Sequence, residues 1–153
     1  MVSDDRESTC PFCEIAEGRS PADRVYETPD ALAFLPLSPA ATGHTLIIPK
    51  LHITDLWHAD TRSLEPVMKA SLVVAQALKR ALSPDGLNLI NSTGSAATQT
   101  VFHLHIHLVP RWNGDQMGNF WPESAPWAEP KRAAMAERIR NSIEELRLSQ
   151  RDR

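Results

Sequence analysis

The stretch QTVFHLHIHLVPR, residues 99–111, decides the fold of this chain. Polar and apolar residues alternate strictly from His103 to Leu108, which is the period of a half-buried β-strand. Alternate residues of a strand line one face, so the three histidines are expected to project together at spacings of about 6.6–7 Å. The predicted faces carry His103, His105 and His107 on one side and the core-facing Leu104, Ile106 and Leu108 on the other.

Three imidazoles on one face have a chemical interpretation and a structural one. Imidazole is the side chain whose ordinary pKa lies nearest neutrality, so three of them can supply a nucleophile, a general acid and a metal ligand. The alternative is the solvated polar face of a strand. Half of the chain's six histidines gather in this stretch, and that concentration favours the chemical interpretation.

Length and composition indicate a single globular domain. The chain has 153 residues, 42% of them hydrophobic, which is enough to bury a core without disulfides. Its net charge of -3 argues against binding to nucleic acid or to an anionic membrane, and its apolar runs are too short to span a bilayer. The first residues are polar and acidic, so we expect no signal peptide and a cytoplasmic protein.

The two cysteines of the chain form the motif Cys10-Pro11-Phe12-Cys13. In a reducing compartment a C-x2-C pair is either half of a zinc site or a redox pair, and this motif resembles the active site of a glutaredoxin. A thioredoxin-like fold requires an apolar strand just before the motif, whereas residues 4–9 are polar. A zinc site requires four ligands, and histidines are candidates for the other two.

The rest of the pattern predicts five short strands and two helices. Apolar runs and turn residues place strands near residues 25–27, 31–35, 44–50, 87–91 and 103–108. Helical apolar spacing runs from Ser63, because Pro66 is tolerable only in the first turn, to Ser83, and again from Pro130 to Leu146. Grouped strands predict an α+β fold with an antiparallel sheet. Residues 1–9 are expected to form a disordered tail, 10–112 the domain core, and 113–153 an extension whose helix packs on the same domain.

These motifs resemble the signature of the histidine triad (HIT) family, in which three histidines alternate with apolar residues. The likeness covers residues 10–112 and includes the Cys10–Cys13 motif, Ala33-Phe34, GHTLIIPK at residues 43–50, and Gln99-Thr100-Val101. It implies a five-stranded antiparallel sheet with a long central helix and a C-terminal helix, paired as a homodimer. It also implies binding of a purine nucleotide or nucleoside phosphate conjugate and cleavage at the α-phosphate, by hydrolysis or nucleotidyl transfer.

The resemblance assigns catalytic roles to four residues. His105 corresponds to the nucleophile that forms a nucleotidyl-histidine intermediate. His107 corresponds to a contact with the α-phosphate and the leaving atom, and His44 to a fourth histidine that supports the triad. Gln99 corresponds to a group that binds the phosphate and the leaving group.

Further binding residues follow from the same resemblance. Thr100 and Asn91 match polar phosphate contacts, although a polar loop and a turn cap are the respective alternatives. The resemblance implies an apolar slot for the base at Phe12, Ile15, Phe34, Leu35 and Leu37. The alternative is that these residues belong to the hydrophobic core. In the zinc-carrying bacterial branch of the family, the positions that match Cys10, Cys13, His52 and His103 hold a structural zinc ion. His58 has no counterpart and is expected to be a solvated surface residue.

Two positions depart from the family pattern. Pro36 stands where an acid or amide usually holds the ribose hydroxyls, and Thr98 stands where glycine usually precedes the glutamine. The first departure favours an alternative in which the chain binds a nucleotide or zinc without turnover. The intact His105, His107 and Gln99 favour an enzyme.

Overall fold

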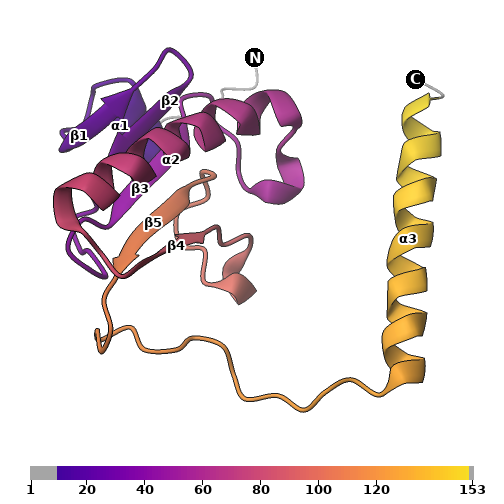
Figure 1. Cartoon of the computed structure of the whole chain (residues 1–153). Coiled ribbons are helices and arrows are strands. Elements are labelled where there is room, and N and C mark those ends of the chain that lie inside the picture. Colours follow the sequence, from indigo (N-terminus) through magenta and orange to yellow (C-terminus); the bar gives the residue numbers. More distant parts are fainter. Residues whose placement is uncertain (1–9, 152–153) are drawn as a thin grey trace. The chain divides into compact units, whose positions relative to one another are not determined.

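A computed structural model describes residues 10–151, so the predicted tail at residues 1–9 lies outside the described part of the chain. The sheet has the strand order β1-β2-β3-β5-β4, and all neighbouring pairs are antiparallel (Figure 1). The prediction of an α+β fold with a five-stranded antiparallel sheet is confirmed. The strands are Arg24–Glu27 (β1), Ala31–Phe34 (β2), Thr45–Pro49 (β3), Gly86–Ile90 (β4) and Ile106–Arg111 (β5).

Three α-helices and two short 3-10 helices occur within residues 10–151. The α-helices are Pro11–Ala16 (α1), Thr61–Leu82 (α2) and Glu129–Arg151 (α3), and the 3-10 helices are Leu56–His58 (η2) and Ser95–Ala97 (η3). None of the described helices is both long enough and apolar enough to cross a membrane.

The chain divides into two compact units, one ending at Gly118 and the other beginning at Asn119. The second unit contains α3, which begins one residue before the predicted start at Pro130. Of the four apolar residues that predicted this helix, Ile139, Ile143 and Leu146 are exposed and Met135 is half-buried. The assignment of residues 10–112 to a core, with α3 packed on the same domain, stays a prediction.

Helix α2 begins two residues earlier than the predicted start at Ser63. The reason is a capping box, in which the Asp60 carboxylate accepts from the Ser63 backbone N–H at 2.8 Å and the Ser63 hydroxyl accepts from the Asp60 backbone N–H at 3.0 Å. Pro66 therefore lies beyond the first turn, where it removes one intrahelical hydrogen bond. The helix ends at Leu82, and Ser83 follows in the left-handed conformation.

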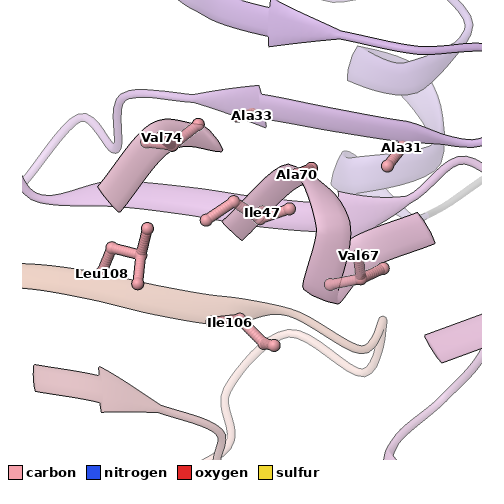
Figure 2. Packing of buried hydrophobic residues seen from close by; sticks show 8 residues of the cluster. All are labelled: Ala31, Ala33, Ile47, Val67, Ala70, Val74, Ile106 and Leu108. Atoms are coloured by element: carbon pink, nitrogen blue, oxygen red, sulfur yellow. The ribbon is translucent and has the colours of Figure 1, made fainter. Parts of the chain in front are cut away.

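One face of the sheet packs against α2 through small and branched apolar side chains (Figure 2). Small side chains at the contact allow the helix to approach the strands closely, and each branched side chain that is fully buried contributes about 1.5–3 kcal/mol. The helix supplies Val67, Ala70 and Val74, and the sheet supplies Ala31, Ala33, Ile47, Ile106 and Leu108.

The opposite face of the sheet packs against α1 and carries the histidines. Cys10, Phe12 and Cys13 lie in one buried cluster with Leu32, Phe34, Leu46 and Ile48. Strands β2 and β3 are buried on both faces, which explains why they read as continuous apolar runs rather than as an alternation. His107 is paired directly with Leu46, so its side chain lies on the α1 face.

Strand β5 begins at Ile106 rather than at the predicted His103, so only His107 of the three histidines belongs to it. The ladder with β3 stops at Ile47, opposite Ile106, and the preceding residues take other partners. The Leu104 backbone N–H donates to the carbonyl of Ile53 at 2.6 Å, and His103 is fully buried. The inward direction of Leu104, Ile106 and Leu108 is confirmed by their exposures of 1%, 3% and 0%.

Candidate active site and metal centre

His105 is held by a hydrogen bond that determines which of its nitrogens carries the proton. Its Nδ1 lies 2.7 Å from the backbone carbonyl of His103. A carbonyl only accepts, so Nδ1 carries the hydrogen and Nε2 of the neutral ring presents a lone pair. Burial lowers the pKa of His105 below its ordinary value, which favours this neutral form. The arrangement is that of a nitrogen nucleophile.

His107 is oriented by a chain of hydrogen bonds that begins at a backbone amide. The Ala40 N–H donates to Nδ1 of His44 at 3.0 Å, so the proton of neutral His44 lies on Nε2. That Nε2 lies 2.9 Å from Nδ1 of His107, which must then accept, leaving the His107 proton on its own Nε2. Burial lowers the pKa of His44, and burial together with the neighbouring histidines lowers the pKa of His107 to about 4.

The two rings at the centre of the site therefore present complementary groups. The ring centroids of His105 and His107 are 4.8 Å apart. His105 offers a lone pair at Nε2 and His107 offers an N–H at Nε2, so a phosphoryl group between them would meet a nucleophile and a hydrogen-bond donor.

Gln99 is a buried link within the loop that precedes the histidines. Its Nε2 donates to the carbonyls of Thr54 at 2.8 Å and Val101 at 3.1 Å, and its Oε1 accepts from the Gly94 N–H at 2.7 Å. Both amide hydrogens are thus donated to backbone carbonyls. Gln99 positions the loop in this structure, and its contact with substrate stays a prediction.

Thr98 adopts a backbone conformation that explains why glycine is usual at its position. Its φ is 67°, in the left-handed region that costs a residue with a Cβ about 1–2 kcal/mol. Its N–H donates to the carbonyl of Ser95 at 3.0 Å and closes η3. The loop keeps this geometry without glycine, at some cost in strain.

Asn91 supports the histidine segment from β4's end. Its Nδ2 donates to the carbonyl of His105 at 2.9 Å, and its Oδ1 accepts from the Thr93 hydroxyl at 3.0 Å. Its amide therefore holds the backbone of His105, the predicted nucleophile, and the phosphate contact of Asn91 stays a prediction.

The five apolar positions of the predicted base slot do not form one group. Phe12 and Phe34 are buried, and Ile15 packs against the same cluster, as the core alternative expects. Leu35 and Leu37 are exposed, Leu37 completely. Thr100 is exposed and lines a cavity of about 370 Å³ whose walls also include Cys10 and His52.

The four predicted metal ligands come together in a cluster that could hold a metal ion. The ligand atoms of Cys10, Cys13, His52 and His103 all lie within 4.8 Å of one another. Nδ1 of His103 lies 3.4 Å from the Cys10 sulfur and 3.5 Å from the Cys13 sulfur, and Nδ1 of His52 lies 3.2 Å from the Cys13 sulfur. A tetrahedral zinc ion with normal bond lengths requires sulfur–nitrogen edges of about 3.5 Å.

The protonation of His103 also suits a metal ligand. Its Nε2 lies 2.8 Å from the carbonyl of Pro49, so the proton lies there and Nδ1 keeps its lone pair for the metal. Burial lowers the pKa of His103 to about 4, so the ring is neutral near pH 7. The donor set, its spacing and this hydrogen bond all fit zinc.

Several partners in the site are backbone groups that no side-chain motif could reveal. The Ala40 amide and the carbonyls of Pro49 and His103 set the protonation of three histidines. Outside the site, Asp55 was missed as well; it is buried, caps η2 and lies 2.7 Å from Nδ1 of His58. His58 is indeed exposed, as predicted, but it is tied to this carboxylate.

The chain resembles known proteins over most of its length. The HIT domain family matches residues 17–114. Protein hit of Bacillus subtilis is 38% identical over 123 residues, which cover 80% of this chain and 85% of that protein. The crystal structure of a zinc-bound histidine triad family protein from Mycobacterium smegmatis is 38% identical, with a TM-score of 0.69, and the match covers 78% of this chain and 86% of that one. The crystal structure of a histidine triad nucleotide-binding protein from Candida albicans is 28% identical, with a TM-score of 0.80, and the match covers 90% of this chain and 99% of that one.

Proposed function

The chain belongs to the histidine triad family of HIT-domain proteins, and on this premise we propose that it cleaves the α-phosphate bond of nucleoside phosphate conjugates. It acts as a hydrolase or nucleotidyl transferase through a nucleotidyl-histidine intermediate. The observation that carries the proposal is the opposite orientation of two neighbouring imidazoles, with a lone pair on His105 and an N–H on His107. The nucleotide-binding relative from Candida albicans supports the choice of ligand.

The proposed reaction has two displacements at phosphorus. Nε2 of His105 bonds to the α-phosphorus while the bond to the leaving group breaks, and the electron pair of that bond goes to the leaving atom. His107 donates a hydrogen bond from Nε2 to the phosphate or the leaving atom as negative charge develops. Water or another acceptor then bonds to the phosphorus as the bond to Nε2 of His105 breaks. The electron pair of that bond returns to Nε2, the acceptor's proton passes to solvent, and the nucleotide is released.

The metal in this proposal is structural. Cys10, Cys13, His52 and His103 would complete a zinc ion's tetrahedral shell, leaving no position for water or substrate. Zinc bound there supplies rigidity between α1 and the segment that carries the nucleophile. The zinc-bound relative from Mycobacterium smegmatis supports this assignment.

A product-release assay tests the proposal directly. The purified protein is incubated with a nucleoside phosphoramidate and, separately, with a dinucleoside polyphosphate, and nucleoside monophosphate is measured. We expect release from at least one substrate. Binding of nucleotide without any release would favour the alternative of a binding module.

The exposed aromatic residues lead us to propose a homodimer. Of the four aromatic residues that follow Arg111, Trp112 is half-buried, and Phe120, Trp121 and Trp127 are exposed by 45%, 75% and 59%. Aromatic surface of this extent usually marks an interface, and twofold pairing is the commonest way to cover it. We expect light scattering at micromolar concentration to give the mass of two chains, and a monomeric mass would contradict this.

Pro36 predicts weak discrimination between ribose and 2′-deoxyribose. The side chain of Pro36 can neither donate nor accept a hydrogen bond, unlike the acid or amide expected at this position of the family. A hydrogen bond to a charged acceptor contributes about 1.5–3 kcal/mol, which is roughly ten- to a hundredfold in affinity. We expect Pro36→Asp to tighten binding of adenosine monophosphate more than that of 2′-deoxyadenosine monophosphate, as measured by calorimetry. If the wild type already prefers the ribonucleotide by about tenfold, another residue holds the sugar.

A further inference from the structure

Helix α1 places one aromatic ring between the predicted metal ligands and the predicted nucleophile. Phe12 lies within the Cys10–Cys13 motif and is only 8% exposed. Its ring meets the ring of His105 edge to face, with centroids 5.2 Å apart and an interplanar angle of 88°. The same ring lies 6.0 Å from the ring of His103 and 5.5 Å from that of Phe34.

Two separate routes therefore connect the metal centre with His105. The first is main chain: His103, a candidate ligand, accepts the Nδ1 proton of His105 at its carbonyl. The second is the Phe12 ring, which is carried by α1, the short helix that contains Cys13 and is capped by Cys10. A metal bound to both cysteines and His103 would fix both routes together.

The hydrogen bond alone leaves the His105 ring incompletely restrained. It anchors one edge of the imidazole, and the ring can still rock about that anchor and sweep Nε2 through an arc. A perpendicular aromatic ring against the imidazole limits that rocking, and edge-to-face pairs contribute about 0.5–1.5 kcal/mol beyond area burial. Phe12 is placed to supply this second restraint.

We propose that Phe12 is a positioning residue which couples the metal-binding segment to the orientation of His105. Phe12 and the loaded metal centre together hold the His105 ring with Nε2 directed into the site. The inference rests on the proposed function for its kinetic consequence, but the orientation of the ring can be measured without turnover. It differs from the sequence-based expectation that Phe12 is a wall of the base slot.

The test compares full-length, zinc-loaded wild type with Phe12→Leu, which keeps an apolar side chain and removes the ring. In protein labelled with ¹⁵N-histidine, we expect wild-type His105 to give one sharp pair of ring signals, with Nδ1 protonated and Nε2 bare. Phe12→Leu should broaden or average this pair. Removing zinc from the wild type with a chelator should do the same. If the protein turns over a nucleotide substrate, kcat should fall about tenfold in Phe12→Leu while KM stays within about twofold.

Two further variants separate positioning from general packing. Leu32→Val removes one methylene group from the same buried cluster and is expected to lower thermal stability while leaving the His105 signals sharp. Phe12→Tyr keeps the ring and should retain the wild-type signals. Zinc content is measured for every variant, so that loss of metal is not mistaken for loss of the ring.

Three results would overturn the proposal. Unchanged His105 signals with a raised KM in Phe12→Leu would make Phe12 a wall of the nucleotide slot. Equal broadening in Leu32→Val would make the effect one of packing. Unchanged signals after zinc removal would break the link to the metal centre. Absence of turnover on every substrate would contradict the proposed function alone, because the ring signals report orientation without it.

Discussion

Replacing His105 with alanine is expected to lower turnover by at least about a thousandfold while leaving nucleotide affinity within a few-fold of the wild type. The covalent route requires the Nε2 lone pair of His105, which no other described group presents at the same place. Apolar and phosphate contacts come from other residues, so the ground-state complex should persist. Product release in single turnovers measures the expected loss of turnover, and calorimetry measures the expected retention of nucleotide affinity.

A surface histidine provides the matched control for this experiment. His58 is tied to Asp55 and lies outside the triad, so His58→Ala should keep turnover near the wild-type rate. Trapping the nucleotidyl group on any residue other than His105 would contradict the assignment. Full activity of His105→Ala would contradict the covalent mechanism itself.

The core-facing side of the histidine strand could be predicted from local pattern, and the cluster of possible metal ligands from the cysteine spacing together with the family resemblance. Alternation at 103–108 correctly places Leu104, Ile106 and Leu108 in the interior. The cysteine spacing, with two histidines supplied by resemblance, identifies four residues that the structure brings within 4.8 Å. The strand boundary at Ile106 could not be predicted, because it depends on where β3 stops offering a partner.

The orientation of the histidines could not be predicted for a related reason. It depends on the Ala40 amide and on the carbonyls of His103 and Pro49, which every residue type carries and which only the fold brings into place. Gln99 shows the same limit. The resemblance assigns it to the phosphate, which stays a prediction, and only the fold reveals that its amide hydrogens are donated to the backbone carbonyls of Thr54 and Val101.

The start of α2 could have been predicted from two residues of the sequence. Asp60 and Ser63 have the spacing of a capping box, although serine replaces the more usual glutamate or glutamine. The expected start at Ser63 follows instead from placing Pro66 in the first turn. This helix of 22 residues tolerates one missing hydrogen bond because its apolar face is buried against the sheet.

Loss of the metal is expected to have the second large effect, on stability rather than on chemistry. A ligand present at about a thousand times its dissociation constant stabilises the folded state by about 4 kcal/mol. Cys10→Ala removes one of four ligands, so we expect zinc loss and a fall of about that size in the free energy of unfolding. The chemical rate of the surviving folded protein should fall less, by about tenfold, or 1.4 kcal/mol.

Cys10 also caps α1, and a serine variant separates that role from metal binding. The Cys10 sulfur accepts from the Cys13 N–H at 3.4 Å, and loss of such a cap alone costs about 1 kcal/mol. Cys10→Ser keeps a capping oxygen and removes the soft ligand, so it should lose zinc and the part of the free energy of unfolding that zinc supplies. The free energy of unfolding of Cys10→Ala should be lower still, by the contribution of the cap. Denaturant unfolding with and without a chelator measures this: the chelator should destabilise the wild type and leave both variants unchanged. Metal analysis that finds no zinc in wild-type protein purified without chelators would remove the basis of the prediction.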